Sequence, residues 1–139
     1  MERQTIVLER DIDAPPERVY RAFLTPADLF KWYYATEGWT TPYARIDERV
    51  GGEFHIGFRS PDGAMEFDYW GTYDVLEPSS RIVQTLGDGR KVETRFVTVD
   101  GNKTRVIWSF ETEPTHSLEQ QRQGWGGQLE HLATYLKSS

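Results

Sequence analysis

The C-terminal stretch 117-SLEQQRQGWGGQLEHLATYL-136 decides the fold. Ser117, followed three residues later by Gln120, matches a capping box, in which each side chain bonds the backbone amide of the other residue at a helix start. The apolar residues that then recur at helical spacing are Leu118, Trp125, Leu129, Leu132 and Leu136. The stretch therefore predicts a helix of about 20 residues, or ~30 Å, which is long enough to cross a whole sheet.

Short strands separated by turns precede this helix. Residues Thr5 to Ile12 alternate apolar and polar side chains, which predicts a first strand. Further alternating runs are separated by turn sequences such as Ser60-Pro61-Asp62-Gly63 and Asp100-Gly101-Asn102-Lys103. These runs predict strands over residues 43–49, 53–59, 66–76, 81–86, 91–99 and 104–112. Because tight turns join them, we expect an antiparallel meander.

Two short helices are expected between the first strand and the meander. Asp13-Ala14-Pro15-Pro16-Glu17 and Thr25-Pro26-Ala27-Asp28 each place proline and an acidic residue where a helix begins. We expect Thr25 to cap the second helix, which carries Leu29 and Trp32. The sequence therefore predicts one α+β domain over residues 1–139, in which a sheet curls around the long C-terminal helix.

Charge and composition exclude several classes of protein. Sixteen basic residues against 22 acidic ones give a net charge of -6 without a basic stripe, which disfavours nucleic-acid binding. The absence of cysteine excludes disulfides and thiol chemistry. No apolar run approaches the ~20 residues of a membrane span, and the N-terminus does not resemble a signal peptide, so we expect a cytoplasmic protein. No metal-ligand spacing, phosphate loop or nucleophile elbow is present, and no metal or cofactor is expected.

The order of elements, with the residues that punctuate it, resembles the START-like helix-grip superfamily (SRPBCC). Within it, the chain is similar to the homologues of a heat-shock chaperone's ATPase activator, over nearly its whole length. The residues that carry the resemblance include Ala14-Pro15, Val50-Gly51-Gly52, Gly71 with Tyr73, Pro78 with Arg81, and Gly124-Trp125. The resemblance implies a curved antiparallel sheet of six to seven strands gripping the last helix, with a cavity between them. It implies no single reaction, because members include binding proteins, carriers, cyclases and co-chaperone domains.

Aromatic side chains on the inner strand faces are the candidate walls of this cavity. Gly71 is expected to leave a gap between Tyr69 and Tyr73. Gly126-Gly127 either widens the cavity, admits a close contact with the sheet, or is a tolerated weak point of the helix. The alternative is that the rings only fill a close-packed core. The residues expected to bind a ligand are Trp32, Trp39, Phe54, Ile56, Phe58, Phe67, Tyr69, Tyr73, Trp108, Trp125, Gln128 and Leu129.

Several polar residues have a predicted place in the sheet. Arg10 falls in register with the inward residues of the first strand, so it needs a carboxylate or several carbonyl partners. Glu111 and Glu113 are candidates if the first and last strands pair, and a structural ion pair is favoured over capture of a ligand. His131 is expected in solvent. His55 is expected on the outer face; if the strand alternation is inverted, His55 and Glu53 become an inner acid–base pair. The paired carboxylates expected to point outward are Glu66 and Asp68.

Three functions remain open at this stage. The first is binding of a small hydrophobic, amphipathic or aromatic molecule in the cavity. The second is an enzyme of cyclase or dehydratase type, with Tyr69, Tyr73, Gln128 and His55 as candidate groups. The third is a protein-interaction module or homodimer that uses the segment 32–43, where Tyr33, Tyr34 and Trp39 form either a lid over the cavity or a contact surface.

Overall fold

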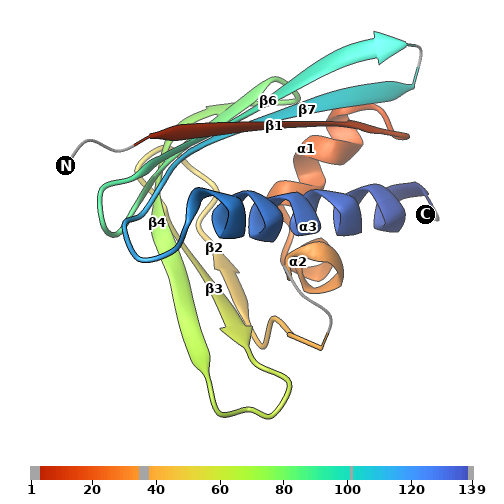
Figure 1. Ribbon diagram of the computed structural model, residues 1–139. Helices are drawn as coiled ribbons and strands as arrows, with labels where there is room; N and C mark the ends of the chain where they lie inside the picture. Colours follow the sequence, from red (N-terminus) through yellow and green to blue (C-terminus); the bar gives the residue numbers. More distant parts are fainter. Residues whose placement is uncertain (1–3, 35–37, 101, 138–139) are drawn as a thin grey trace.

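A computed structural model describes residues 4–34, 38–100 and 102–137. A curved sheet wraps around one long helix in it, and two short helices lie beside that helix (Figure 1). The elements are β1 (Thr5–Ile12), α1 (Pro16–Leu24), α2 (Pro26–Trp32), β2 (Ala44–Ile46), β3 (Glu53–Arg59), β4 (Glu66–Glu77), β5 (Arg81–Leu86), β6 (Lys91–Asp100), β7 (Lys103–Glu111) and α3 (Leu118–Lys137). The seven strands are antiparallel in the order β1-β7-β6-β5-β4-β3-β2. The predicted α+β helix-grip architecture is confirmed.

Strand boundaries agree with the prediction except at β2, which is three residues long instead of seven. The chain leaves the sheet after Ile46 because it enters a turn, closed by a 2.8 Å bond from the Gly52 amide to the Arg49 carbonyl. Gly51 in this turn has φ 85°, a conformation that favours glycine. The turn between β6 and β7 falls partly on Gly101, which lies outside the described residues.

The two predicted helix caps had different outcomes. At α3 the capping box is confirmed: the Gln120 amide donates to Ser117 Oγ, and the Ser117 amide donates to Gln120 Oε1, both at 3.1 Å. At α2, Thr25 occupies the predicted N-cap position, but its side chain makes no capping bond. Its hydroxyl accepts a 3.3 Å bond from Arg21 and caps no amide of α2. The first helical residue of α2 is Pro26, which has no amide proton to satisfy.

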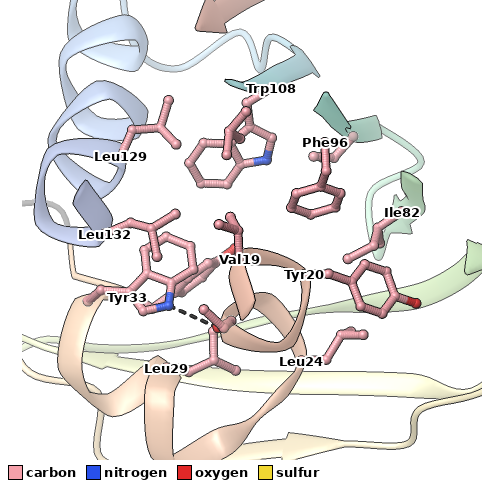
Figure 2. Close-up of a cluster of buried hydrophobic side chains, with 14 of the residues drawn as sticks. Val19, Tyr20, Leu24, Leu29, Tyr33, Ile82, Phe96, Trp108, Leu129 and Leu132 are labelled. Atoms are coloured by element: carbon pink, nitrogen blue, oxygen red, sulfur yellow. Dashed lines mark hydrogen bonds between the residues drawn. The ribbon is translucent and has the colours of Figure 1, made fainter. Parts of the chain in front are cut away.

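The core lies between the concave face of the sheet and the helices. Figure 2 shows Leu129 and Leu132 of α3 on one side of this cluster and Phe96 and Ile82 of the sheet on the other, with Trp108 near Leu129. Trp32 is fully buried, and its indole Nε1 donates a 2.9 Å bond to the carbonyl of Ala22 in α1. Large rings thus fill the C-terminal half of the space under α3. Within the described residues, no helix is both long and apolar enough to cross a bilayer.

A β-bulge changes which residues of β4 face the core. The register with β5 shifts between Tyr73 and Val75, so the alternation of inner and outer side chains inverts there. Tyr73 packs into the core before the bulge, and Leu76 packs against it after the bulge. The predicted inner face at Tyr69 and Tyr73 lies before the bulge and is unaffected by it.

Two polar residues have partners other than those expected. The partner predicted for Arg10 was wrong: its Nε donates to Glu130 of α3 at 2.8 Å, because β1 packs alongside that helix. The solvent position predicted for His131 was also wrong. Its half-buried ring donates from Nδ1 to the Tyr34 carbonyl at 2.6 Å and stacks on the Tyr34 ring at 4.0 Å. Both contacts hold α3 to the rest of the fold.

A buried carboxylate joins the three helices. Asp28 of α2 accepts two bonds from Arg18 of α1, at 2.9 and 3.0 Å, and one from the Tyr135 hydroxyl of α3, at 2.5 Å. Burial opposes ionisation of Asp28, but the hydrogen bonds from Arg18 and Tyr135 outweigh it and lower the pKa of the carboxyl group. Asp28 is therefore ionised at neutral pH and fixes the relative positions of α1, α2 and α3.

Replacing Asp28 with asparagine tests this junction. We expect Asp28→Asn to lower the free energy of unfolding by about 1–3 kcal/mol at pH 7, because bonds to a charged acceptor are lost. The pKa is depressed in the folded state, so the contribution is present above the unfolded value of about 4 and disappears as the pH falls through the folded value. The difference in free energy of unfolding between the native protein and Asp28→Asn, measured by urea denaturation, should therefore become smaller below about pH 4.

The matched control is Asp11→Asn, which removes a carboxylate from the exposed ion pair with Arg105. Exposed pairs contribute little to stability, so its effect should be much smaller. An equal decrease in the free energy of unfolding for Asp28→Asn and Asp11→Asn would contradict the role given to Asp28.

Candidate functional site

A cavity of about 430 Å³ lies between the first half of α3 and the part of the sheet formed by β3 and β4. One wall is aromatic, and its six rings come from the segment after α2, from β3 and β4, and from α3: Tyr33, Trp39, Phe58, Phe67, Tyr69 and Trp125. The cavity therefore lies beside the filled core, where the first half of α3 faces β3 and β4.

Trp125 is the fixed ring of this wall. It stacks on Phe110 with ring centroids 4.1 Å apart and planes 9° from parallel, and it meets Trp108 edge to face at 4.8 Å. Both partners are buried in β7. A ring held on two sides cannot turn away easily, so Trp125 offers a rigid apolar surface to the cavity.

The part of this wall formed by Trp39 and Phe67 is more exposed. Trp39 stacks against Phe67 with centroids 5.7 Å apart and planes 16° from parallel. Phe67 is 48% exposed, although it is apolar. A stacked pair of rings beside a cavity, one exposed and one half-buried, is suited to cover an apolar molecule within it.

The Tyr69 hydroxyl is a buried polar atom of the aromatic wall. It has no hydrogen-bond partner among the described residues. Burial raises its pKa well above the usual value, so the phenol stays protonated at physiological pH. The neighbouring ring of Tyr33, 6.0 Å away between centroids, is also buried, and burial raises its pKa too.

Arg90 brings a positive charge to the cavity from the turn between β5 and β6. The Arg90 amide donates to Asp88 Oδ1 at 3.1 Å, and its guanidinium Nε donates to Asp88 Oδ2 at 2.8 Å. Between them, Gly89 has φ 90°, which lets the chain turn within so few residues. The turn sequence therefore fixes both the backbone and the side chain of Arg90.

A carboxylate and an imidazole complete the polar side. Nδ1 of His116 lies 3.1 Å from both carboxylate oxygens of Glu113. Gln121 of α3 holds this loop: its Nε2 donates to the carbonyls of Glu113 and His116, and its Oε1 accepts the Glu113 amide. Burial opposes ionisation of Glu113, but the bonds from His116 outweigh it and lower the pKa of Glu113. Gln120 and Gln128 of α3 also line the cavity.

The twelve residues expected to bind a ligand divide into two groups. The cavity is lined by Trp39, Phe58, Phe67, Tyr69, Trp125 and Gln128. The others lie in or against the packed core: Trp32, Phe54, Ile56, Tyr73, Trp108 and Leu129. Alternation identifies the inner face of a strand, but it does not say whether α3 touches that part of the face.

The polar side of the cavity was missed by sequence reasoning. Arg90, Glu113 and His116 all lie in connections between elements, where strand alternation gives no direction. The sequence Gly87-Asp88-Gly89 was the one available signal, because an aspartate between glycines commonly bonds the next backbone amides.

His55 and its carboxylate neighbours lie on the outer face, as expected. Its Nδ1 is 2.8 Å from Asp68, and its Nε2 is 3.0 Å from Glu53. Hydrogen bonds to Asp68 and then Glu53 raise the pKa of His55. The three side chains do not form a metal-binding arrangement, and no other such group occurs among the residues that the structure describes.

Comparison with known proteins places the chain in a family. A family model described as "Activator of Hsp90 ATPase homolog 1-like protein" matches residues 13–137. The chain belongs to this family. Comparison with curated proteins finds no match.

Solved structures share the fold over almost the full chain. An AHSA1-like protein from Aeromonas hydrophila is 32% identical with a TM-score of 0.89, and the match covers 97% of this chain and 93% of that chain. A protein from Chromobacterium violaceum is 31% identical with a TM-score of 0.87, covering 96% and 97%. One from Cytophaga hutchinsonii is 35% identical with a TM-score of 0.81, covering 96% and 92%.

Glycines occupy two different environments in this AHSA1-like fold. A Cβ added at Gly124 would meet no atom within 4 Å, because Gly124 lines the cavity. The gap predicted at Gly71 was wrong: a Cβ there would collide with the Thr85 carbonyl oxygen and lie 2.9 Å from the Leu86 Cα. Gly71 is needed for close approach of β4 and β5. At Gly126 a Cβ would only touch Leu8, at 4.0 Å, so no close contact with the sheet requires this glycine.

The two environments predict opposite effects of alanine. We expect Gly124→Ala to raise the free energy of unfolding by about 0.5–1 kcal/mol, because alanine favours the helix and the added methyl group enters open space. Gly71→Ala should lower it, because the backbone of β5 must move. Thermal and urea denaturation of both variants measure this. Destabilisation by Gly124→Ala would mean that this side of α3 is packed in solution.

Proposed function

We propose that the protein binds a small, largely apolar molecule in the cavity beneath the first half of α3. The observation that carries the proposal is the cavity itself, about 430 Å³ in volume and walled by six aromatic rings. Ligand sites of roughly 300–1,000 Å³ with apolar walls and a few polar groups are typical of small-molecule binding proteins. The helix-grip fold of the family is one that commonly binds ligands or proteins.

The aromatic wall favours a flat, ring-containing ligand. Trp125 is held from behind by Phe110 and Trp108, while Trp39 and Phe67 stand on the exposed side. A flat molecule between these surfaces gains stacking as well as burial. The polar groups near Arg90 and Glu113 add a hydrophilic end, which suits an amphipathic molecule better than a pure hydrocarbon.

Catalysis on the bound molecule is a second candidate, supported by one observation. The imidazole of His116 and the carboxylate of Glu113 line the cavity and lie 3.1 Å apart. Such a pair can accept and return a proton in an isomerisation or a dehydration. Mass spectrometry of a bound ligand before and after incubation tests this. An unchanged ligand would mean that the protein only binds it, whereas a new product that is absent with His116→Gln would support an enzyme.

A protein-interaction role has less support. The exposed apolar surface expected for it in the segment 32–43 is not found in the described residues, because Trp32 and Tyr33 are buried. The segment also borders the cavity, since Tyr33 and Trp39 line it.

Filling the cavity tests the binding proposal. Gly124→Leu places a bulky side chain in the open space, so we expect it to weaken binding of aromatic ligands at least tenfold while the protein stays folded. The measurement is tryptophan-fluorescence titration with flavonoids, fatty acids and polyketide-like aromatics, together with native mass spectrometry of the purified protein. The control is Arg122→Leu, which adds the same side chain at an exposed position of α3. Equal affinity in the two variants, or no binding by the native protein, would overturn the proposal.

A further inference from the structure

The Tyr69 hydroxyl is the polar atom of the cavity whose bonding is incomplete. Its oxygen is buried, and none of the described residues gives it a hydrogen bond. Native proteins leave few buried polar atoms unpaired, and those that remain often mark the place of a missing partner. Tyr69 lines the cavity, so a bound molecule can supply that partner.

The hydroxyl of Tyr69 has a donor that an acceptor on a bound molecule can satisfy, although its oxygen can also accept a bond. Burial keeps the phenol protonated, so Tyr69 offers an O–H donor. The hydroxyl groups of Tyr33 and Tyr69 interact, as their effect on each other's pKa indicates, but the pair does not reach hydrogen-bond geometry, so the Tyr69 hydroxyl still lacks a full partner. The Arg90 guanidinium also lines the cavity, so it brings a second hydrogen-bond donor to the site. Its positive charge lowers the pKa of Tyr69, against the effect of burial.

The surrounding charges argue against an anionic acceptor. Among the described residues of the cavity lining, Arg90 is the one arginine or lysine, and its Nε is already bonded to Asp88, which does not line the cavity itself. The low pKa of Glu113 keeps it ionised, and it is bonded to His116. Because Arg90 is already paired with Asp88 and an ionised carboxylate lies in the lining, the described lining of the cavity has no uncompensated positive charge, which disfavours a carboxylate or phosphate in a chain of net charge -6. A neutral carbonyl oxygen accepts hydrogen bonds without adding charge.

We propose that the cavity selects uncharged aromatic carbonyl compounds, and that the Tyr69 hydroxyl donates a hydrogen bond to the carbonyl oxygen while the rings lie against Trp125. This specificity rests on the proposed ligand-binding function and goes beyond it, because it assigns the ligand class and the residue that determines it. Tyr69 is thus a specificity-determining residue, and its role is separable from the apolar contacts of the wall.

Three probes of similar shape separate the contributions. Benzophenone carries two phenyl rings on a carbonyl, diphenylmethane replaces the carbonyl with a methylene group, and diphenylacetate adds a carboxylate. Dissociation constants come from NMR chemical-shift titration of the native protein and of Tyr69→Phe. We expect the native protein to bind benzophenone roughly 3- to 10-fold more tightly than diphenylmethane, the range for one neutral hydrogen bond. Diphenylacetate should bind more weakly than either.

Tyr69→Phe should abolish the preference for benzophenone and leave the affinity for diphenylmethane unchanged. Folding is not at risk, because the substitution removes an unpaired buried hydroxyl, and such a change is close to neutral or stabilising. Tyr43→Phe is the matched control: it removes a tyrosine hydroxyl that is bonded to Asp68 away from the cavity, so it should keep the preference.

Each other outcome overturns a distinct claim. Equal affinity for benzophenone and diphenylmethane, unchanged in Tyr69→Phe, would reject the carbonyl specificity and leave the binding function standing. Tightest binding of diphenylacetate, lost in Arg90→Met, would reject the preference for uncharged ligands. Failure of all three probes to shift any resonance of the cavity residues would reject the binding function itself, and this proposal with it.

Discussion

The packing of α3 into the curved sheet is the constraint on which the rest of the structure depends. The second half of this helix is apolar on its inner face, and Leu129, Leu132 and Leu136 are buried there. The first half instead presents Gln121, Gly124 and Trp125 to the cavity, and Trp125 lies against its wall. The leucines hold the helix at a fixed distance from the sheet, and the small and polar residues leave the space beneath its first half unfilled. The cavity thus follows from the unequal composition of one helix.

The connections around the helix make this arrangement rigid. The capping box at Ser117 starts α3 at a defined residue, and Gln121 binds the loop before it at three backbone atoms. At the other end, Tyr135 reaches Asp28, which also binds Arg18. Hydrogen bonds at both ends of α3 thus act together with the apolar contacts of its leucines and of Trp125 to hold the helix over the cavity.

The fold could be predicted from the sequence much further than the site. Strand alternation, proline-led helix starts and the capping box are local signals, and they placed most elements within one or two residues. They failed where a partner comes from elsewhere in the chain, as for Arg10 with Glu130 and His131 with Tyr34. They also could not separate Tyr69 from Tyr73, which share one strand face, although one lines the cavity and the other packs in the core. That difference depends on where α3 lies, which no local pattern encodes.

The division of α3 into a packing half and a cavity half has an evolutionary consequence. Residues such as Gly124 and Phe67 border the cavity, so substituting them changes the shape of the cavity without creating a void in the core. Leu132 and Trp108 have no such freedom, because close-packed neighbours surround them. Ligand preference can therefore drift among descendants of one ancestor while foldability is inherited intact. Relatives that share this architecture at about one-third sequence identity need not share a ligand.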